Sequence, residues 1–92
     1  MPLALVTGAS RGIGRGIAIE LGRLGWRIAV NYAGNSDAAA STVAAVAEAG
    51  GSAFPVQGDV GDDTDRARLV AACLEDHRSE EHTSELQSLL II

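Results

Sequence analysis

Residues 7–14 read Thr-Gly-Ala-Ser-Arg-Gly-Ile-Gly, and this glycine-rich stretch is the strongest indication of the fold. The residues before it, Leu-Ala-Leu-Val at 3–6, form an apolar run that is typical of a buried parallel strand. The residues after it show helical spacing, which puts four apolar side chains on one face: Ile13, Ile17, Leu21 and Leu24. The glycines therefore lie where a strand turns sharply into a helix.

A turn of this kind favours phosphate binding, because the first N–H groups of a helix are unpaired and its dipole is positive there. We expect Gly8 to permit the turn, Gly12 to let a pyrophosphate approach the backbone, and Gly14 to let the helix pack closely on the strand. The alternative is a turn that binds nothing, since chance glycine spacings are common in a chain with 11 glycines. A second strand about twenty residues further on favours the binding interpretation.

The rest of the pattern alternates strand and helix. Strands are expected at 27–31 and 52–57, and helices at 37–49, with Ser36 as N-cap, and from about Asp62. Pro55 cannot donate to a sheet ladder, so the third strand should lie at an edge. The buried face of the third helix is predicted to carry Ala67, Val70, Ala71 and Leu74.

This alternation predicts an α/β fold: an incomplete Rossmann-like, doubly wound parallel sheet with strand order 3-2-1. The first two helices should cover one face of the sheet and the third helix the other. We expect no fourth strand to follow, so the first strand should be left as an edge.

The loop at 7–14, written Thr-Gly-x-x-x-Gly-x-Gly, resembles the cofactor loop of the short-chain dehydrogenase/reductase family. With Val-Asn-Tyr-Ala-Gly-Asn at 30–35, it is similar to the 3-oxoacyl-acyl-carrier-protein reductase type within that family. The resemblance runs from about residue 3 to residue 77. It implies an NAD(P)-binding Rossmann domain and reduction of a carbonyl by a nicotinamide cofactor.

The resemblance implies a cofactor site made by Gly8, Ser10, Arg11, Gly12, Ile13, Gly14, Asn31, Tyr32, Asp59 and Val60. In the family, a basic residue at the position of Arg11 contacts the 2′-phosphate of NADP, and the planar guanidinium suits that role. The end of the second strand carries no acid to accept from the ribose 2′-hydroxyl of NAD. We therefore expect NADP(H) to be favoured over NAD(H). The alternatives are a solvated Arg11 and an Asn31 that merely ends its strand.

Asp59 and Val60 follow the third strand at its carboxyl end, where ligands bind in open α/β sheets. By the same resemblance, Asp59 would accept from the adenine amino group and Val60 would pack on the ring, while Asn31 and Tyr32 would line the adenosine pocket. The alternative for Asp59 is an acid at the entry of the next helix.

The chain offers no catalytic residue. The family uses a Ser and a Tyr-x-x-x-Lys pair, in which Lys lowers the pKa of Tyr and Tyr moves the proton. The sequence contains no lysine, and Tyr32 is its only tyrosine, with Ser at position 36. His77 and His82 have no metal-ligand spacing, so no metal site is assigned either.

Composition limits the partners. The net charge of −5 and the scattered arginines argue against nucleic acid and against an anionic membrane. Residues 1–6 are too short for a secretory signal, and no stretch is long enough to cross a bilayer. Cys73 is the single cysteine, which rules out an internal disulfide and favours a cytoplasmic location.

The sequence changes character at residue 78. Residues 78–88, Arg-Ser-Glu-Glu-His-Thr-Ser-Glu-Leu-Gln-Ser, resemble the direct translation of a common short-read sequencing adapter, and Leu-Leu-Ile-Ile follows. We therefore interpret residues 1–77 as the N-terminal half of an NAD(P)-binding Rossmann domain and residues 78–92 as a non-native tail.

Three interpretations of function are open at this stage. The one we favour is an inactive, cofactor-binding fragment of an NADP(H)-dependent reductase that acts on a carbonyl of a small molecule or acyl group, in a homo-oligomeric parent. The others are a stand-alone nucleotide-binding module and an interaction protein with an idle glycine loop.

Overall fold

The structure is a computed structural model, and it describes residues 2–81 and 89–92. The elements follow one another as β1 (Leu3–Val6), α1 (Gly12–Arg23), β2 (Arg27–Tyr32), α2 (Ser36–Glu48), β3 (Ser52–Gln57), α3 (Asp63–Glu81) and β4 (Leu89–Ile91). The strands form one parallel sheet in the order β3-β2-β1-β4. The predicted Rossmann-like α/β class is confirmed.

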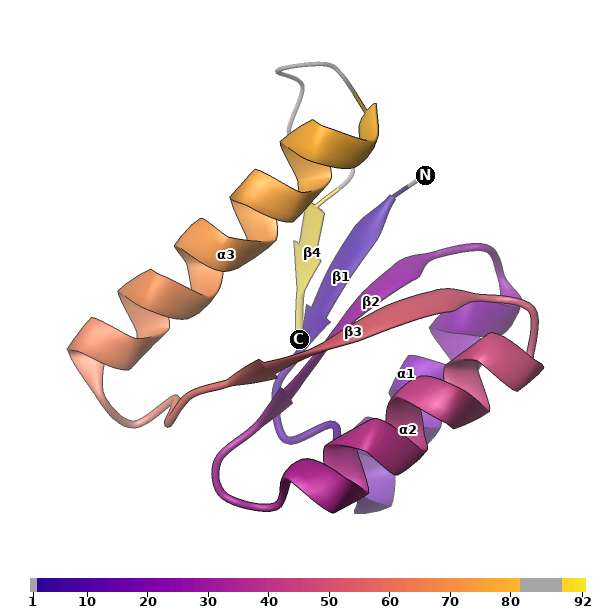
Figure 1. Cartoon of the computed structure of the whole chain (residues 1–92), viewed down its shortest axis with the longest axis horizontal. Coiled ribbons are helices and arrows are strands. Elements are labelled where there is room, and N and C mark those ends of the chain that lie inside the picture. The colour runs from indigo at the N-terminus through magenta and orange to yellow at the C-terminus, as the bar shows by residue number, and fades with distance from the viewer. Residues whose placement is uncertain (1, 82–88) are drawn as a thin grey trace.

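Helices cover both faces of this sheet, as predicted. Figure 1 shows α1 and α2 together on one side of the strands and α3 on the other. Alternate residues of β1 face the two layers: Ala4 and Val6 pack toward the α1–α2 layer, and Leu3 and Leu5 pack toward α3. All of β1 is buried, which explains why its sequence is a continuous apolar run.

The expectation that the sheet stops at three strands is wrong. β4 pairs in parallel with β1, and Leu3 lies opposite Leu89. The Ile92 N–H donates to the Leu5 carbonyl at 2.9 Å, and the Thr7 N–H donates to the Ile92 carbonyl at 2.8 Å. The physical reason is that β1 would otherwise expose apolar side chains and unpaired backbone groups, which the apolar residues 89–92 can cover.

The proposed division at residue 78 stays a prediction. Helix α3 continues without a break through Arg78 to Glu81, beyond the point where the sequence changes character. Residues 82–88, which carry most of the adapter-like stretch and His82, lie outside the described residues.

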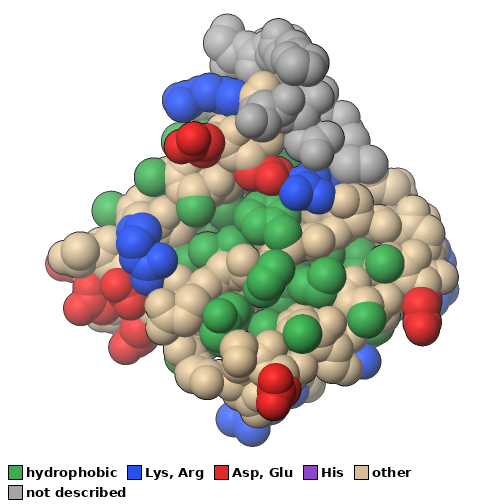
Figure 2. Space-filling view, in the orientation of Figure 1, with side chains coloured by type: hydrophobic (Ala, Val, Ile, Leu, Met, Phe, Trp, Pro, Cys, Tyr) green, Lys and Arg blue, Asp and Glu red, His purple; other side chains and the backbone are tan. Residues whose placement is uncertain are grey.

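Strand β3 forms the outer edge of the sheet on the side of β2, as Pro55 predicts. Pro55 is exposed and sits opposite Val30, and its missing N–H leaves the outer ladder broken at that point. Figure 2 shows hydrophobic side chains gathered on this side of the molecule, over β3 and between α3 and α2.

Helix α3 shows a different buried face from the predicted one. The buried side chains of α3 are Leu69, Cys73 and His77, whereas Ala67 and Ala71 are exposed. Residues 69–74 are all apolar, so spacing alone could not select the face. Contact with Leu3, Leu5 and Val56 of the sheet selects it instead.

An ion pair fastens α3 to the sheet at the far end from the glycine loop. Arg27 of β2 donates to both carboxylate oxygens of Asp76, from Nε at 2.7 Å and from Nη2 at 2.8 Å. The guanidinium also lies over the Phe54 ring, 4.6 Å from its centroid. A two-point arginine contact of this kind fixes orientation as well as distance, so it sets the angle of α3 on the sheet.

Two details at the helix ends differ from prediction. Ile17 and Leu21 of α1 pack against the core, but Ile13, in the first turn, is 84% exposed and Leu24, the C-cap residue, is 70% exposed. The N-cap of α2 is Asn35, not Ser36: its side-chain oxygen accepts from the Ala38 N–H at 2.9 Å.

Candidate functional site

The loop between β1 and α1 adopts the sharp turn that its glycines predict. Gly12 has a φ of +66°, in the left-handed region that side chains rarely adopt. Gly14 faces the loop so closely that a Cβ there would lie 2.9 Å from the carbonyl carbon of Gly8. The first turn of α1 can therefore pack directly on the loop only because residue 14 has no side chain.

The N-terminus of α1 differs from those of the other helices in the described part of the chain. Its N-cap residue, Arg11, makes no side-chain capping bond, and the first turn holds no acid. By contrast, Asn35 caps α2, and the Asp62 side chain caps α3 by accepting from the Asp65 N–H at 2.9 Å. The α1 N-terminus thus combines free backbone donors with an exposed cation, which suits an anion.

Asn31, at the end of β2, forms a hydrogen bond with the backbone of the glycine loop. It is 3% exposed, and its side-chain oxygen accepts from the Gly8 N–H at 3.2 Å. Its amide nitrogen donates to the carbonyls of Val56 and Gly58, at 3.3 and 3.1 Å. Asn31 therefore joins the ends of three neighbouring strands, which is more than ending its own strand. Its direct contact with a cofactor stays a prediction.

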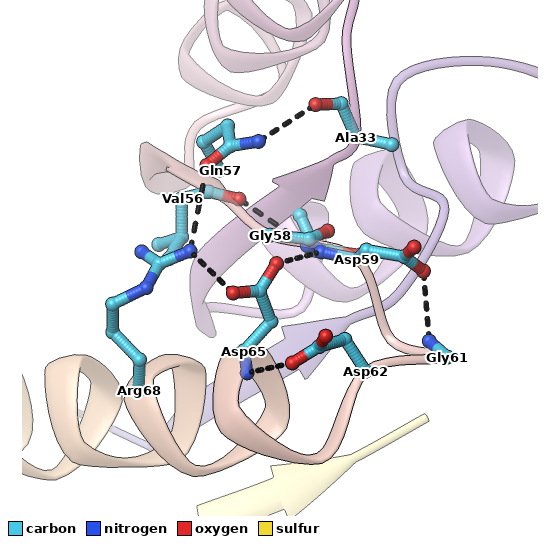
Figure 3. A network of polar contacts seen from close by, with 10 residues as sticks. Ala33, Val56, Gln57, Gly58, Asp59, Gly61, Asp62, Asp65 and Arg68 are labelled. Carbon is cyan, nitrogen blue, oxygen red and sulfur yellow. Dashed lines mark hydrogen bonds and ion pairs between the residues drawn. The ribbon is translucent and has the colours of Figure 1, made fainter.

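The loop after β3 is shaped by side chains of α3 (Figure 3). The Asp65 carboxylate accepts from the Asp59 N–H at 2.8 Å, and the Asp59 Oδ1 accepts from the Gly61 N–H at 2.8 Å. This second bond leaves the other carboxylate oxygen of Asp59, an exposed residue, for a further donor. Val60 is 41% exposed and lines a pocket with Leu5, Thr7, Ile91 and side chains of α3.

The predicted site residues gather at the carboxyl ends of the strands. Gly8, Ser10, Arg11, Gly12, Ile13 and Gly14 lie in or next to the β1–α1 turn, Asn31 and Tyr32 end β2, and Asp59 and Val60 follow β3. Asn31 connects the first group to the last through its bonds to Gly8 and Gly58. Tyr32 is only partly exposed and packs its ring against the α1–α2 core.

Sequence reasoning missed three polar residues that support these loops. Buried Thr42 of α2 donates to the Ser10 carbonyl at 3.2 Å and accepts from Arg15 at 3.1 Å. Gln57 donates to the Ala33 carbonyl at 2.9 Å, and Asp65 accepts from Asp59. Of these three, Thr42 could have been noticed in the sequence, because it is a polar residue placed at helical spacing between the apolar residues Ala39 and Val46.

Among the described residues, one carboxyl group, that of Asp65, and one thiol, that of Cys73, have pKa values shifted by identifiable causes. The hydrogen bond from the Asp59 N–H lowers the pKa of Asp65, and the nearby Arg68 guanidinium lowers it further. Burial raises the pKa of Cys73 to about 11, and the Asp76 charge adds to the rise. Cys73 is therefore a neutral core thiol and no nucleophile at neutral pH.

Residues 2–81 and 89–92 contain no cluster of three or more His, Cys, Asp or Glu side chains placed to hold a metal ion. Within the same residues, no helix has both the length and the apolar character needed to cross a membrane.

An open parallel sheet with a glycine turn into an uncapped helix defines the class of α/β proteins that bind nucleotides at this edge. The family model described as short chain dehydrogenase matches residues 2–80. The chain belongs to this family of oxidoreductases.

Curated relatives match over part of their length. The chain is 57% identical over 58 residues to the 1-cyclohexenylcarbonyl-CoA reductase of Streptomyces collinus. These aligned residues make up 63% of this chain and 21% of that reductase. It is 51% identical over 57 residues to the 3-oxoacyl-[acyl-carrier-protein] reductase FabG of Staphylococcus epidermidis, covering 62% of this chain and 23% of FabG. The chain therefore spans about a quarter of the length of such relatives.

Solved structures show the same arrangement of elements. The reductase LugOII, which catalyses keto-reduction in lugdunomycin biosynthesis, superposes with a TM-score of 0.83 at 41% identity, over 96% of this chain and 35% of LugOII. The angucycline C-6 ketoreductase LanV with bound NADP superposes with a TM-score of 0.74 at 44% identity, over 87% of this chain and 31% of LanV.

Proposed function

We propose that this chain forms the adenosine-binding half of an NADP(H) site in a short-chain reductase. The observation that carries the proposal is the N-terminus of α1, which is uncapped, free of acids and flanked by the exposed Arg11. Gly12 and Gly14 give a pyrophosphate access to its N–H groups, and Asn31 holds the turn in place.

Three features favour NADP(H) over NAD(H). Arg11 supplies a planar cation beside the turn, and the segment from Asn31 to Asn35 supplies no carboxylate to repel a 2′-phosphate. LanV, a relative in fold and sequence, was solved with NADP.

Asp59 and Val60 would then hold the adenine, through the free carboxylate oxygen of Asp59 and the half-exposed side chain of Val60.

The activity proposed for the complete protein is hydride transfer from NADPH to a carbonyl, including that of a 3-oxoacyl group. The names of the relatives support this class of substrate. A bound nicotinamide would supply the hydride. The 92 residues of this chain contain no Tyr-x-x-x-Lys pair to move the proton. We therefore propose no catalytic role for its own residues. A cytoplasmic, homo-oligomeric parent is part of the same proposal.

The test of cofactor choice is a titration of the full chain with NADPH and NADH. We expect NADPH to bind more tightly, and Arg11→Ala to weaken NADPH by roughly 1–3 kcal/mol while leaving NADH nearly unchanged, because one charge-assisted phosphate contact is lost. Arg23→Ala is the matched control, since Arg23 is an exposed arginine at the opposite end of α1. Equal losses for both cofactors would show that Arg11 does not contact the 2′-phosphate.

A stand-alone nucleotide-binding module is the second candidate, and β4 is the observation that favours it. This strand fills the position beside β1, so the four described strands form a continuous sheet. Genomic DNA that encodes residues 78–92 followed by a stop codon would support the module. An open reading frame that continues past residue 77 into a Tyr-x-x-x-Lys motif would support the reductase.

A further inference from the structure

The loop of residues 58–61 is held from α3 at two points. The Asp65 carboxylate accepts from the Asp59 N–H at 2.8 Å, and the Arg66 Nη1 donates to the Val60 carbonyl at 2.7 Å. Figure 3 shows the Asp65 side chain rising from the first turn of α3 to the backbone of the loop. The two residues proposed to hold adenine are thus anchored through their backbones by the helix that follows them.

Asp65 is itself fixed in direction. Its own N–H donates to the Asp62 side chain at 2.9 Å, so its backbone belongs to the cap of α3. Its other carboxylate oxygen lies 3.5 Å from the Arg68 Nη2. A carboxylate that accepts a backbone N–H forms a charge-assisted bond, while the longer contact with half-exposed Arg68 adds little. The hydrogen bond to the Asp59 N–H is therefore the stronger of the two interactions of the Asp65 carboxylate.

The same group of side chains reaches the end of β2. Gln57 donates to the Ala33 carbonyl at 2.9 Å, and its side-chain oxygen lies 3.4 Å from the Arg68 Nη2. Arg68 consequently stands between Asp65 and Gln57 (Figure 3). The loop after β3 and the loop after β2 are tied to each other through α3.

We propose that Asp65 is a positioning residue of the nucleotide site, which fixes the Asp59–Val60 backbone so that both side chains face an adenine. The proposal rests on the proposed function, because it assumes that these two residues receive the adenosine end of a cofactor. A positioned group loses less entropy on binding than a free one, so the effect of Asp65 should appear as affinity for adenosine.

Asp63 offers a matched control for Asp65. Both carboxylates lie in the first turn of α3, so both interact with the helix dipole in the same way. The Asp63 side chain is 90% exposed and pairs with Arg66, and no hydrogen bond joins it to the loop. Its ion pair is solvent-exposed and contributes little, so we expect Arg66 to keep its bond to the Val60 carbonyl when Asp63 is replaced.

The first arm of the experiment uses the ligand-free, ¹⁵N-labelled full chain. In Asp65→Ala, we expect the Asp59 amide proton to shift upfield and to exchange faster with solvent, because its acceptor is gone. In Asp63→Ala, the same amide should stay in place. Asp65→Asn keeps an oxygen acceptor and should restore most of the wild-type signal. If circular dichroism shows that Asp65→Ala loses helix, Asp65→Leu, which has a similar size, favours helix and lacks an acceptor, replaces it. If the chemical shift and the exchange rate of the Asp59 amide are the same in Asp65→Ala as in the wild type, the proposal is overturned.

The second arm measures affinity for two probes, adenosine 2′,5′-bisphosphate and inorganic pyrophosphate. Asp65→Ala should weaken the adenosine probe roughly tenfold, in line with the loss of a hydrogen bond to a charged group. Pyrophosphate, followed by the amide shifts of Gly12 and Gly14, should bind the variant as it binds the wild type. Equal losses for both probes, or equal losses in Asp63→Ala, would overturn the positioning role. Failure of the wild type to bind either probe would refute the proposed function, while the first arm still decides whether Asp65 holds the loop.

Discussion

Asn31 illustrates how one buried side chain can organise a binding edge. A side-chain amide has both an acceptor and donors, and Asn31 uses them toward the turn after β1 and the end of β3 at once. A leucine or valine in this position would fill the space and leave these backbone groups without partners. Buried polar groups left in that state destabilise a fold by about 1–3 kcal/mol.

The prediction at this scale is that Asn31→Ala lowers the free energy of unfolding by at least that amount, measured by urea denaturation. Asn35→Ala provides the comparison, since Asn35 is an exposed asparagine that makes one capping bond, worth about 1 kcal/mol. The glycine loop should also loosen in Asn31→Ala, seen as faster exchange of the Gly8 amide. Losses of equal size in the two variants would contradict the role assigned to Asn31.

At the scale of the element, α1 and α3 differ in how their N-termini are capped. In helix α3 the Asp62 side chain accepts from the Asp65 N–H, and Asp63 and Asp65 lie near the positive end of the helix. Helix α1 has neither device, and its first turn lies against the loop at Gly14. The first N–H groups of a helix without a side-chain cap need water or a ligand as partner, and the start of α1 is of this kind.

Two alanine substitutions in α1 separate packing from helix propensity. Gly14→Ala should displace the first turn, because its Cβ would meet the Gly8 carbonyl, and NADPH binding should be lost with it. Gly16→Ala introduces the same methyl group two residues later, where nothing lies within 4 Å, and should stabilise the helix by about 0.5–1 kcal/mol. Thermal melts and an NADPH titration of both variants provide the measurements. Retained binding in Gly14→Ala would show that the close approach is not needed.

At the scale of the whole molecule, the open edge of the sheet lies at β4. This strand covers β1, but its own outer side has no neighbour among the described strands. Leu90, Ile91 and Ile92 are 37%, 54% and 44% exposed. The other edge carries Pro55, which interrupts a ladder, so the two edges differ in their capacity to pair with another chain.

We expect the full chain to self-associate through the β4 edge, with sedimentation velocity as the measurement. Leu90→Lys should shift the chain toward monomer, because a lysine on an edge strand opposes pairing. Leu24→Lys is the control: Leu24 is more exposed than Leu90 but lies at the end of α1, away from the edge. A wild-type chain that is monomeric at all concentrations would contradict this expectation.

The alternation of elements, the parallel sheet and the glycine turn could all be predicted from the order of residues. These features depend on local causes: an apolar run at 3–6, glycines at the end of a strand, and a proline at position 55. Such signals act over a few residues and are visible without coordinates. The positions of Arg11 after β1 and Asp59 after β3, together with the family resemblance, made them candidate site residues, and their contacts with a cofactor stay predictions.

The side chains that support the candidate site could be identified only from the folded chain. Asn31 bonds to groups 23 to 27 residues away along the chain, and Thr42 meets a carbonyl 32 residues away. Asp65 lies in the first turn of α3, and its bond to Asp59 depends on how the loop folds back over that helix. The buried face of α3 and the pairing of β4 with β1 were misjudged for a related reason. Both depend on burial against a sheet, and burial is a property of the assembled fold that residue order alone does not contain.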